Sequence, residues 1–112
     1  MKRLTCNKPV LEMDMVELAH NCCYVMDYNA RYRDYELDID ARDLARKLMK
    51  AYADDDDAFI CDEDFDEQMS NYLAYGLESV EGLIAVFYRN LWAMAGLRER
   101  LKRYEDLTEG FE

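Results

Sequence analysis

The sequence predicts a mainly α fold: three or four helices built around a long C-terminal helix, with room for one small β-hairpin. Two observations favour this class. Apolar residues recur at helical spacing in four segments, and the last segment, residues 79–106, is longer than a small domain needs. At 112 residues and 51% hydrophobic content, the chain is long and apolar enough for one modest core. We therefore expect residues 1–112 to form a single domain.

The N-terminal third is predicted to combine an extended arm, a short helix and a hairpin. Residues 1–13 carry the only proline, Pro9, and are expected to form the arm. Asp14 can cap a helix whose apolar residues are Met15, Leu18, Ala19 and Cys22. Within residues 23–33, two aromatic, β-prone runs flank Asp27–Asn29, which is a pattern compatible with a small hairpin.

Two helices are predicted in the middle of the chain. The first, over residues 40–53, is capped by Asp38 or Asp40 and has one apolar face made of Ala41, Leu44, Ala45, Leu48, Met49 and Tyr52. The second, over residues 63–75, places Phe65, Met69, Tyr72 and Leu73 on one side. Gly76 is expected to end it as a left-handed cap. The acidic residues 54–62 between the two helices are expected to form a loop.

The long helix over residues 79–106 carries a spacing typical of coiled coils. Its apolar residues alternate at intervals of four and three, through Val80, Ile84, Phe87, Leu91 and Met94. Leu97, Leu101 and Tyr104 extend this row with a shift in phase. Phe87, Leu91 and Met94 are therefore the residues expected to form the seam of a homodimer, if the chain is a structural or adaptor protein.

The net charge of −11 limits the kinds of partner that the chain can have. An acidic protein is repelled by nucleic acid and by anionic membrane surfaces, and it is attracted to basic proteins. Nine of the acids lie among fourteen residues without a base: Asp54, Asp55, Asp56, Asp57, Asp62, Glu63, Asp64, Asp66 and Glu67. We expect these nine residues to form the partner-binding site.

Two interpretations of this acidic segment stay open. It can be a solvated loop followed by a helix start, since acids favour a helix N-terminus. It can also imitate a phosphate backbone. If the fourteen residues were helical, the nine charges would lie about 2.3 Å apart along the axis, which approaches the roughly 1.7 Å of duplex DNA. A calcium loop of the EF-hand type is excluded, because Ala58 and Ile60 occupy ligand positions and Cys61 replaces the required glycine.

The sequence offers no pattern typical of catalysis or of a cofactor site. The zinc-capable residues Cys6, His20, Cys22, Cys23 and Cys61 match no zinc-site spacing, and whether they bind a metal stays open. Residues 1–6 are charged but are not followed by an apolar run, so we expect no secretory signal and a cytoplasmic protein. In that compartment the four cysteines are expected to be free thiols. The chain is expected not to be an enzyme.

Three stretches carry a resemblance: Ala30–Tyr35, Asp40–Ala45 and Leu91–Leu107. With these stretches the chain resembles small, acidic, uncharacterised proteins of phages and mobile elements of gut Firmicutes. The resemblance implies a mobile-element accessory protein, and short acidic proteins in that setting often inhibit nucleic-acid-targeting defence, as anti-CRISPR proteins do. Together with the acidic segment, it predicts a non-enzymatic inhibitor that docks on a basic nuclease or another nucleic-acid-binding protein.

Overall fold

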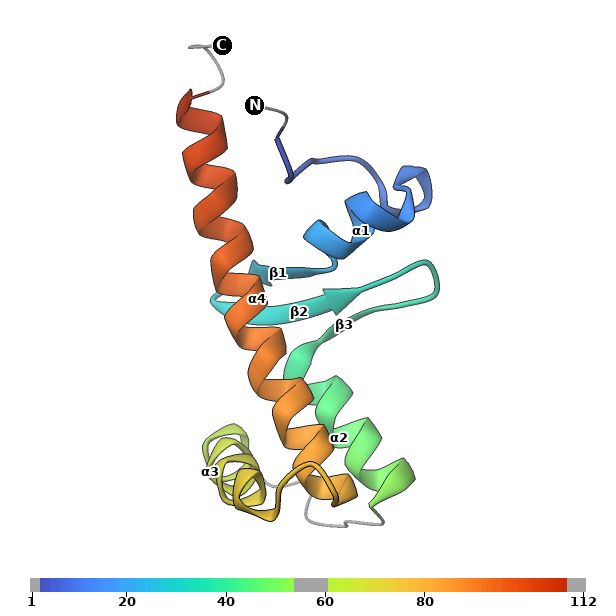
Figure 1. The fold of residues 1–112 in the computed structure, drawn as a ribbon, viewed down its shortest axis with the longest axis vertical. Helices are drawn as coiled ribbons and strands as arrows, with labels where there is room; N and C mark the ends of the chain where they lie inside the picture. The colour runs from blue at the N-terminus through green and yellow to red at the C-terminus, as the bar shows by residue number, and fades with distance from the viewer. Residues whose placement is uncertain (1–2, 54–60, 109–112) are drawn as a thin grey trace.

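A computed structural model describes residues 3–53 and 61–108. It confirms the mainly α class: this part of the chain contains four α-helices, a long C-terminal helix among them, and one small antiparallel sheet. Figure 1 shows that the C-terminal helix runs along the long axis of the molecule, with the sheet crossing beside its middle.

The first helix, α1 (Met15–Asn21), begins where the sequence predicts. The Asp14 carboxylate accepts a hydrogen bond from the Glu17 backbone N–H at 2.8 Å, and the Glu17 carboxylate accepts one from the Asp14 N–H at 3.2 Å. This capping box satisfies two backbone donors that a helix start otherwise leaves unpaired. The preceding arm contains one 3₁₀ turn, Val10–Glu12, which the extended interpretation of residues 1–13 did not include.

The sheet has three strands rather than the two of a hairpin. Strands β1 (Cys23–Met26) and β2 (Asn29–Arg33) are joined by Asp27 and Tyr28, which both have positive φ. Two successive residues of this kind form the type I′ turn that matches the twist of a hairpin. The third strand, β3 (Asp38–Asp40), pairs antiparallel with β2. It was not predicted, because three residues containing two aspartates give no apolar alternation.

Helices α2 (Ala41–Tyr52) and α3 (Asp62–Tyr72) correspond to the two predicted central helices. Asp40 caps α2 and accepts a hydrogen bond from the Arg42 N–H at 2.8 Å. After α3, the chain tightens into a 3₁₀ turn, Leu73–Tyr75, and stops at Gly76, whose φ is +78°. Its ψ of −179° lies outside the left-handed helical region, so Gly76 is not the predicted left-handed cap, but its positive φ still favours glycine there.

Helix α4 (Val80–Thr108) is the long C-terminal helix. Its first turn lies against the preceding loop. A Cβ on Gly82 would lie 1.9 Å from the Gly76 carbonyl oxygen, so no other residue fits at this close approach. Gly96, by contrast, has open space around the position of a Cβ.

The hydrophobic core lies where the sheet, α2 and α3 meet the first half of α4 (Figure 1). Its most deeply buried large side chains are Phe65 and Met49. Ile84 and Leu91 of α4 are also buried in it. The seam predicted from Phe87, Leu91 and Met94 therefore needs correction, because Leu91 packs inside its own chain while Phe87 and Met94 are exposed.

The N-terminal arm lies along the second half of α4 and is held by polar contacts. The Glu105 carboxylate accepts hydrogen bonds from the backbone N–H groups of Leu4 and Thr5 at 2.7 and 3.0 Å, and from the Thr5 hydroxyl at 2.6 Å. Asn21 at the end of α1 is fully buried, and its side-chain oxygen accepts from the Cys6 N–H at 3.0 Å and from the Arg98 guanidinium at 3.0 Å.

Candidate protein-binding site

The acidic segment is described from its second half onward. Asp54, Asp55, Asp56 and Asp57 lie outside the described residues. Within the predicted loop 54–62, only Cys61 and Asp62 are described, and Asp62 is already the first residue of α3. The other predicted binding residues, Glu63, Asp64, Asp66 and Glu67, all belong to α3, so a helix presents the described part of the site.

Glu63, Asp64 and Glu67 lie together on the outer face of α3. Their spacing of one, three and four residues places them within about one third of the helix circumference. All three are exposed. No ion pair involves any of them in the part of the chain that the structure describes. On the opposite side of the helix, Phe65 and Met69 are buried in the core, so the three carboxylates stand on an anchored support. We call these three residues the acidic α3 face.

Asp66 and Asp62 have a different role from the acidic α3 face. Asp66 forms a two-point ion pair with the Arg42 guanidinium, whose closest N–O distance is 2.7 Å, and it also accepts a hydrogen bond from the Tyr88 hydroxyl. Asp62 pairs with Arg46 at 2.8 Å. Both carboxylates therefore tie α3 to α2, and only three of the five described acids in this segment are left for a partner.

The contact with Asp66 also changes the acidity of its neighbours. The hydrogen bonds from Arg42 to Asp66 raise the pKa of Arg42, and burial together with the Asp66 hydrogen bond raises the pKa of Tyr88. The Arg42 guanidinium also lies 4.9 Å from the centre of the Trp92 ring, which is a cation–π contact. No sequence pattern indicates this cluster, because Arg42, Asp66 and Tyr88 are more than twenty residues apart from one another along the chain.

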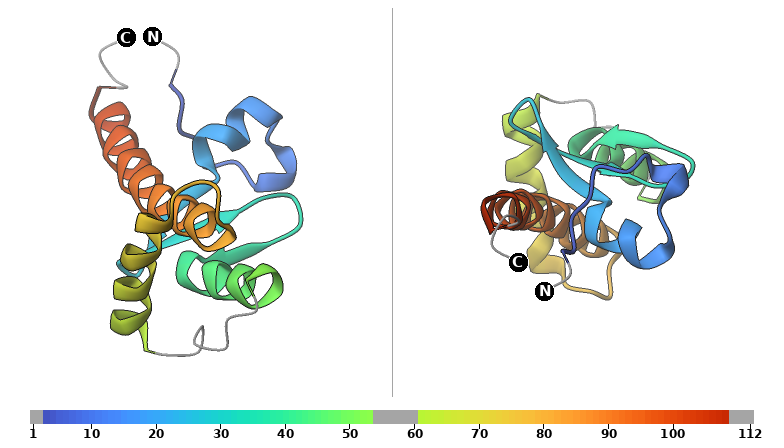
Figure 2. Two further views of the ribbon diagram at one scale, coloured as in Figure 1. Left: turned by 60° about the horizontal axis from the view of Figure 1, so that its bottom comes forward. Right: turned by 90° about the horizontal axis from the view of Figure 1, so that it is seen from above.

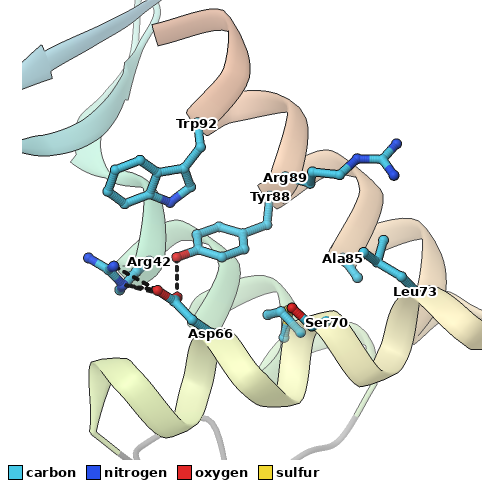
Figure 3. A pocket seen from close by; sticks show the side chains of 9 residues that line it. Arg42, Asp66, Ser70, Leu73, Ala85, Tyr88, Arg89 and Trp92 are labelled. Carbon is cyan, nitrogen blue, oxygen red and sulfur yellow. Dashed lines mark hydrogen bonds and ion pairs between the residues drawn. The ribbon is translucent and has the colours of Figure 1, made fainter. Parts of the chain in front are cut away.

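A cavity of about 420 Å³ lies between α3 and α4 beside this cluster. Figure 3 shows Trp92 and Tyr88 on one wall, with Ser70 and Leu73 on the α3 side and the Arg89 guanidinium pointing outward at the rim. Aromatic rings next to an arginine are typical of the residues that anchor a protein partner. The cavity is close to the acidic α3 face because Ser70 lies one helical turn after Glu67.

The cysteines do not form a metal site in the part of the chain that the structure describes. No group of three or more His, Cys, Asp or Glu side chains there is arranged to hold an ion. Cys22 and Cys23 lie at the junction of α1 and β1, with their sulfur atoms 3.9 Å apart. The hydrogen bond with Cys23 lowers the pKa of Cys22 to about 6, while the same contact and burial raise the pKa of Cys23.

None of the described helices is both long enough and apolar enough to cross a membrane. Comparisons with known proteins found no matching family model, no similar curated protein and no similar solved structure. The resemblance to acidic mobile-element proteins therefore stays a prediction.

Proposed function

We propose that this chain is a non-enzymatic acidic binding protein that docks on a basic nucleic-acid-handling protein and inhibits it. The observation that supports the proposal best is the acidic α3 face, where three exposed carboxylates stand side by side on a helix fixed by Phe65 and Met69. A fixed array of charges does not have to be ordered again on binding, so little of the attraction is lost to side-chain and loop entropy.

The charge of the whole chain supports the same proposal. A net charge of −11 attracts a basic surface over a distance of about a Debye length and raises the rate of encounter. The partner surface that fits this field is one that normally binds phosphates. Occupying such a surface keeps nucleic acid away from it, and inhibition follows by competition. A nuclease of the RNA-guided kind is the partner class that the resemblance adds, as for an anti-CRISPR protein acting in the cytoplasm.

The cavity between α3 and α4 adds an apolar anchor next to the charged face. Charge pairs at the edge of an interface mainly steer and orient a partner, whereas buried aromatic contacts supply most of the affinity. In this proposal the three carboxylates orient the partner, and one of its apolar side chains enters the cavity against Trp92 and Leu73. Asp66 lines this cavity, but its charge is already paired with Arg42 and Tyr88 and does not attract the partner.

A matched pair of variants tests the proposal against a panel of purified RNA-guided nucleases. The first variant neutralises the acidic α3 face through Glu63→Gln, Asp64→Asn and Glu67→Gln. The control neutralises three exposed acids elsewhere, through Glu12→Gln, Asp27→Asn and Glu36→Gln. Both variants have the same net charge. Three edge charges at about 0.5 kcal/mol each predict about tenfold weaker binding for the first variant.

The readouts are the dissociation constant at two salt concentrations and the cleavage of duplex DNA by the nuclease. The proposal predicts that the unmodified chain blocks cleavage, that added salt weakens its binding, and that the control variant stays close to the unmodified chain. If the two triple variants lose the same binding affinity, only the total charge of the chain matters and not the acidic α3 face. Absence of binding across the panel would refute this choice of partner class.

A further inference from the structure

Helix α4 carries a second apolar row that does not face the core. Its positions alternate at intervals of three and four, and seven of the eight are hydrophobic or aromatic: Val80, Leu83, Phe87, Asn90, Met94, Leu97, Leu101 and Tyr104. This alternation over more than three heptads is the spacing of the a and d positions of a coiled coil. We call these eight residues the outer α4 face.

The outer α4 face is open to solvent. Six of its side chains, all except Asn90 and the half-buried Leu101, are between 38% and 65% exposed. The residues that α4 buries in the core, such as Ile84, Leu91 and Ala95, form a neighbouring stripe whose centre is displaced by about 100° around the helix. Figure 1 and the left view of Figure 2 show the sheet, α1 and α2 to one side of α4, and α3 on the other side beside its first half, so it is along the second half that one side of α4 is left uncovered. Phe87 lies at the border of the row and touches the sheet, with its ring edge against Tyr32.

The exposed area is large enough to matter for assembly. If each had the full area of an aromatic side chain, about 150–250 Å², the six exposed side chains would offer at most roughly 600 Å² per copy. A stable protein interface buries about 800 Å² on each partner. The row thus supplies most of one interface by itself, and its neighbours Ala93 and Leu107 enlarge it. A patch of this size lies at the upper end of what a monomer exposes, and such patches are often functional.

The spacing points to a second copy of the same chain as the occupant. A two-fold dimer uses the same surface on both copies, so that surface must be complementary to itself. In an antiparallel pair of helices, each a residue of one copy faces a d residue of the other. With the pair centred on Trp92, Val80 faces Tyr104, Leu83 faces Leu101 and Phe87 faces Leu97. Asn90 then faces Met94 in the two central layers, and no layer lacks a partner.

Charge selects the antiparallel orientation. Residues 98–108 carry four bases and three acids, with Arg100 exposed beside the row, whereas residues 78–90 carry two acids and one base, so the end of the helix is slightly basic and its start slightly acidic. A parallel pair would place the two basic ends together and the two acidic ends together, and the helix dipoles would repel as well. An antiparallel pair places each basic end next to the acidic end of the other copy.

We propose that two copies of this chain form an antiparallel dimer through the outer α4 face, centred on Trp92, where all eight positions of the row have a partner. In this register every position of the row faces a position of the other copy, whereas a shift by one heptad leaves two positions at one end of each row without a partner. The dimer presents the two acidic α3 faces toward opposite ends of the assembly.

Light scattering on the purified full chain, at several concentrations, tests the dimer. The unmodified chain is expected to have twice the mass of one copy. Leu97→Asp is expected to halve that mass, because it places a charge in the middle of the row. The control is Leu11→Asp, the same change at an apolar residue of the N-terminal arm that is 81% exposed, and it should leave the mass unchanged. Circular dichroism should show the same helix content in all three proteins, since both positions are exposed.

A cross-linking experiment tests the orientation. A variant with both Leu83→Cys and Leu101→Cys, treated with oxidised glutathione, should form a disulfide from residue 83 of one copy to residue 101 of the other, identified by mass spectrometry of peptides. The variant with Leu83→Cys alone should give no link beyond those of the unmodified chain under the same treatment. A link from residue 83 to residue 83 would show a parallel dimer and overturn the register.

A monomer at every concentration, or a dimer that survives Leu97→Asp, would overturn the interface. These outcomes are independent of the proposed docking on a basic protein, which is measured by nuclease binding and depends on different residues. The dimer and the docking can therefore each fail while the other holds.

Discussion

The two halves of α4 are held to the rest of the chain by different kinds of contact. The first half packs Ile84, Tyr88 and Leu91 into an apolar core with α2, α3 and the sheet. The second half is joined to the N-terminal arm by polar contacts: Arg98 donates to the Cys6 carbonyl, Glu105 accepts from Leu4 and Thr5, and Asp106 pairs with Arg3. Apolar burial contributes more free energy per residue than hydrogen bonds exchanged with water do. We therefore expect the core half to set global stability and the arm to open locally at a lower cost.

This difference explains why the candidate docking surfaces are where they are. The acidic α3 face stands on the core half, where Phe65 fixes the helix that carries it. The second half of α4 projects beyond the core, with the arm and α1 on one side of it, and its outer side keeps Met94 and Leu97 exposed. The well-packed core half suits the acidic α3 face, because the charges of that face have to stay fixed. A helix that is covered on one side suits pairing with another helix.

The largest effect is expected from Phe65→Ala in the core half. Phe65 is fully buried and meets the Tyr88 ring edge to face, with ring centres 5.6 Å apart. Removing a buried ring leaves a cavity and should lower the free energy of unfolding by about 3–5 kcal/mol. Denaturant titration measures this loss. Leu11→Ala, at an exposed residue, is the control and should cost little. A loss below about 1 kcal/mol for Phe65→Ala would show that the core half is not the stabilising unit.

An intermediate effect is expected from Asn21→Ala in the polar half. The buried Asn21 side chain joins the arm to α4, since it bonds the Cys6 N–H, the Arg98 guanidinium and the Leu4 carbonyl. The change leaves buried polar groups unpaired and should cost about 1–3 kcal/mol.

Hydrogen exchange distinguishes a local from a global effect of Asn21→Ala. The amides of the arm should lose protection while those of α2 keep theirs, because the core contacts are unchanged. Asn71→Ala, at an exposed position of α3, is the matched control. If amides in α2 lose protection as much as those in the arm, the two halves unfold as one unit and the comparison fails.

Local signals explain what could be predicted from the sequence. The starts of α1 and α2 follow from Asp14 and Asp40, because a cap acts on backbone groups only two or three residues away. The end near Gly76 follows for the same reason. The missed strand β3 has three residues and exists only because β2 offers it a partner, so nothing within Asp38–Asp40 predicts it.

The faces of α4 show where periodicity stops being informative. Its apolar residues form two stripes, one turned to the core and one to solvent, and a single sequence does not say which stripe is which. The predicted seam took Leu91 from the core stripe and Phe87 and Met94 from the other. Likewise, Asp66 was expected to bind a partner. Its pairing with Arg42 depends on how α2 and α3 pack, which no spacing along the chain contains.

The smallest effect on stability is expected from Glu105→Gln. Its pH dependence tests how the polar contacts hold the arm to the second half of α4. Burial raises the pKa of Glu105, but hydrogen bonds from Thr5 and from the Leu4 N–H outweigh it, so the pKa lies below its usual value of 4.5. A carboxylate with a lowered pKa in the folded state adds stability above its usual pKa, and this stability is lost as the pH falls through the folded value. Glu105→Gln removes the charge and should cost about 1 kcal/mol near neutral pH.

The amide proton shifts of Leu4 and Thr5, followed by NMR as the pH is lowered, report this titration directly. In the unmodified chain they should move together with a midpoint below 4.5, because both amides donate to the Glu105 carboxylate. In Glu105→Gln, neither amide should show that transition, while α2 amides should behave alike in both proteins. A midpoint at or above 4.5 would mean that burial outweighs the hydrogen bonds. The arm would then be held to α4 by Asn21 and Arg98 rather than by the Glu105 charge, and its attachment would not weaken in acid.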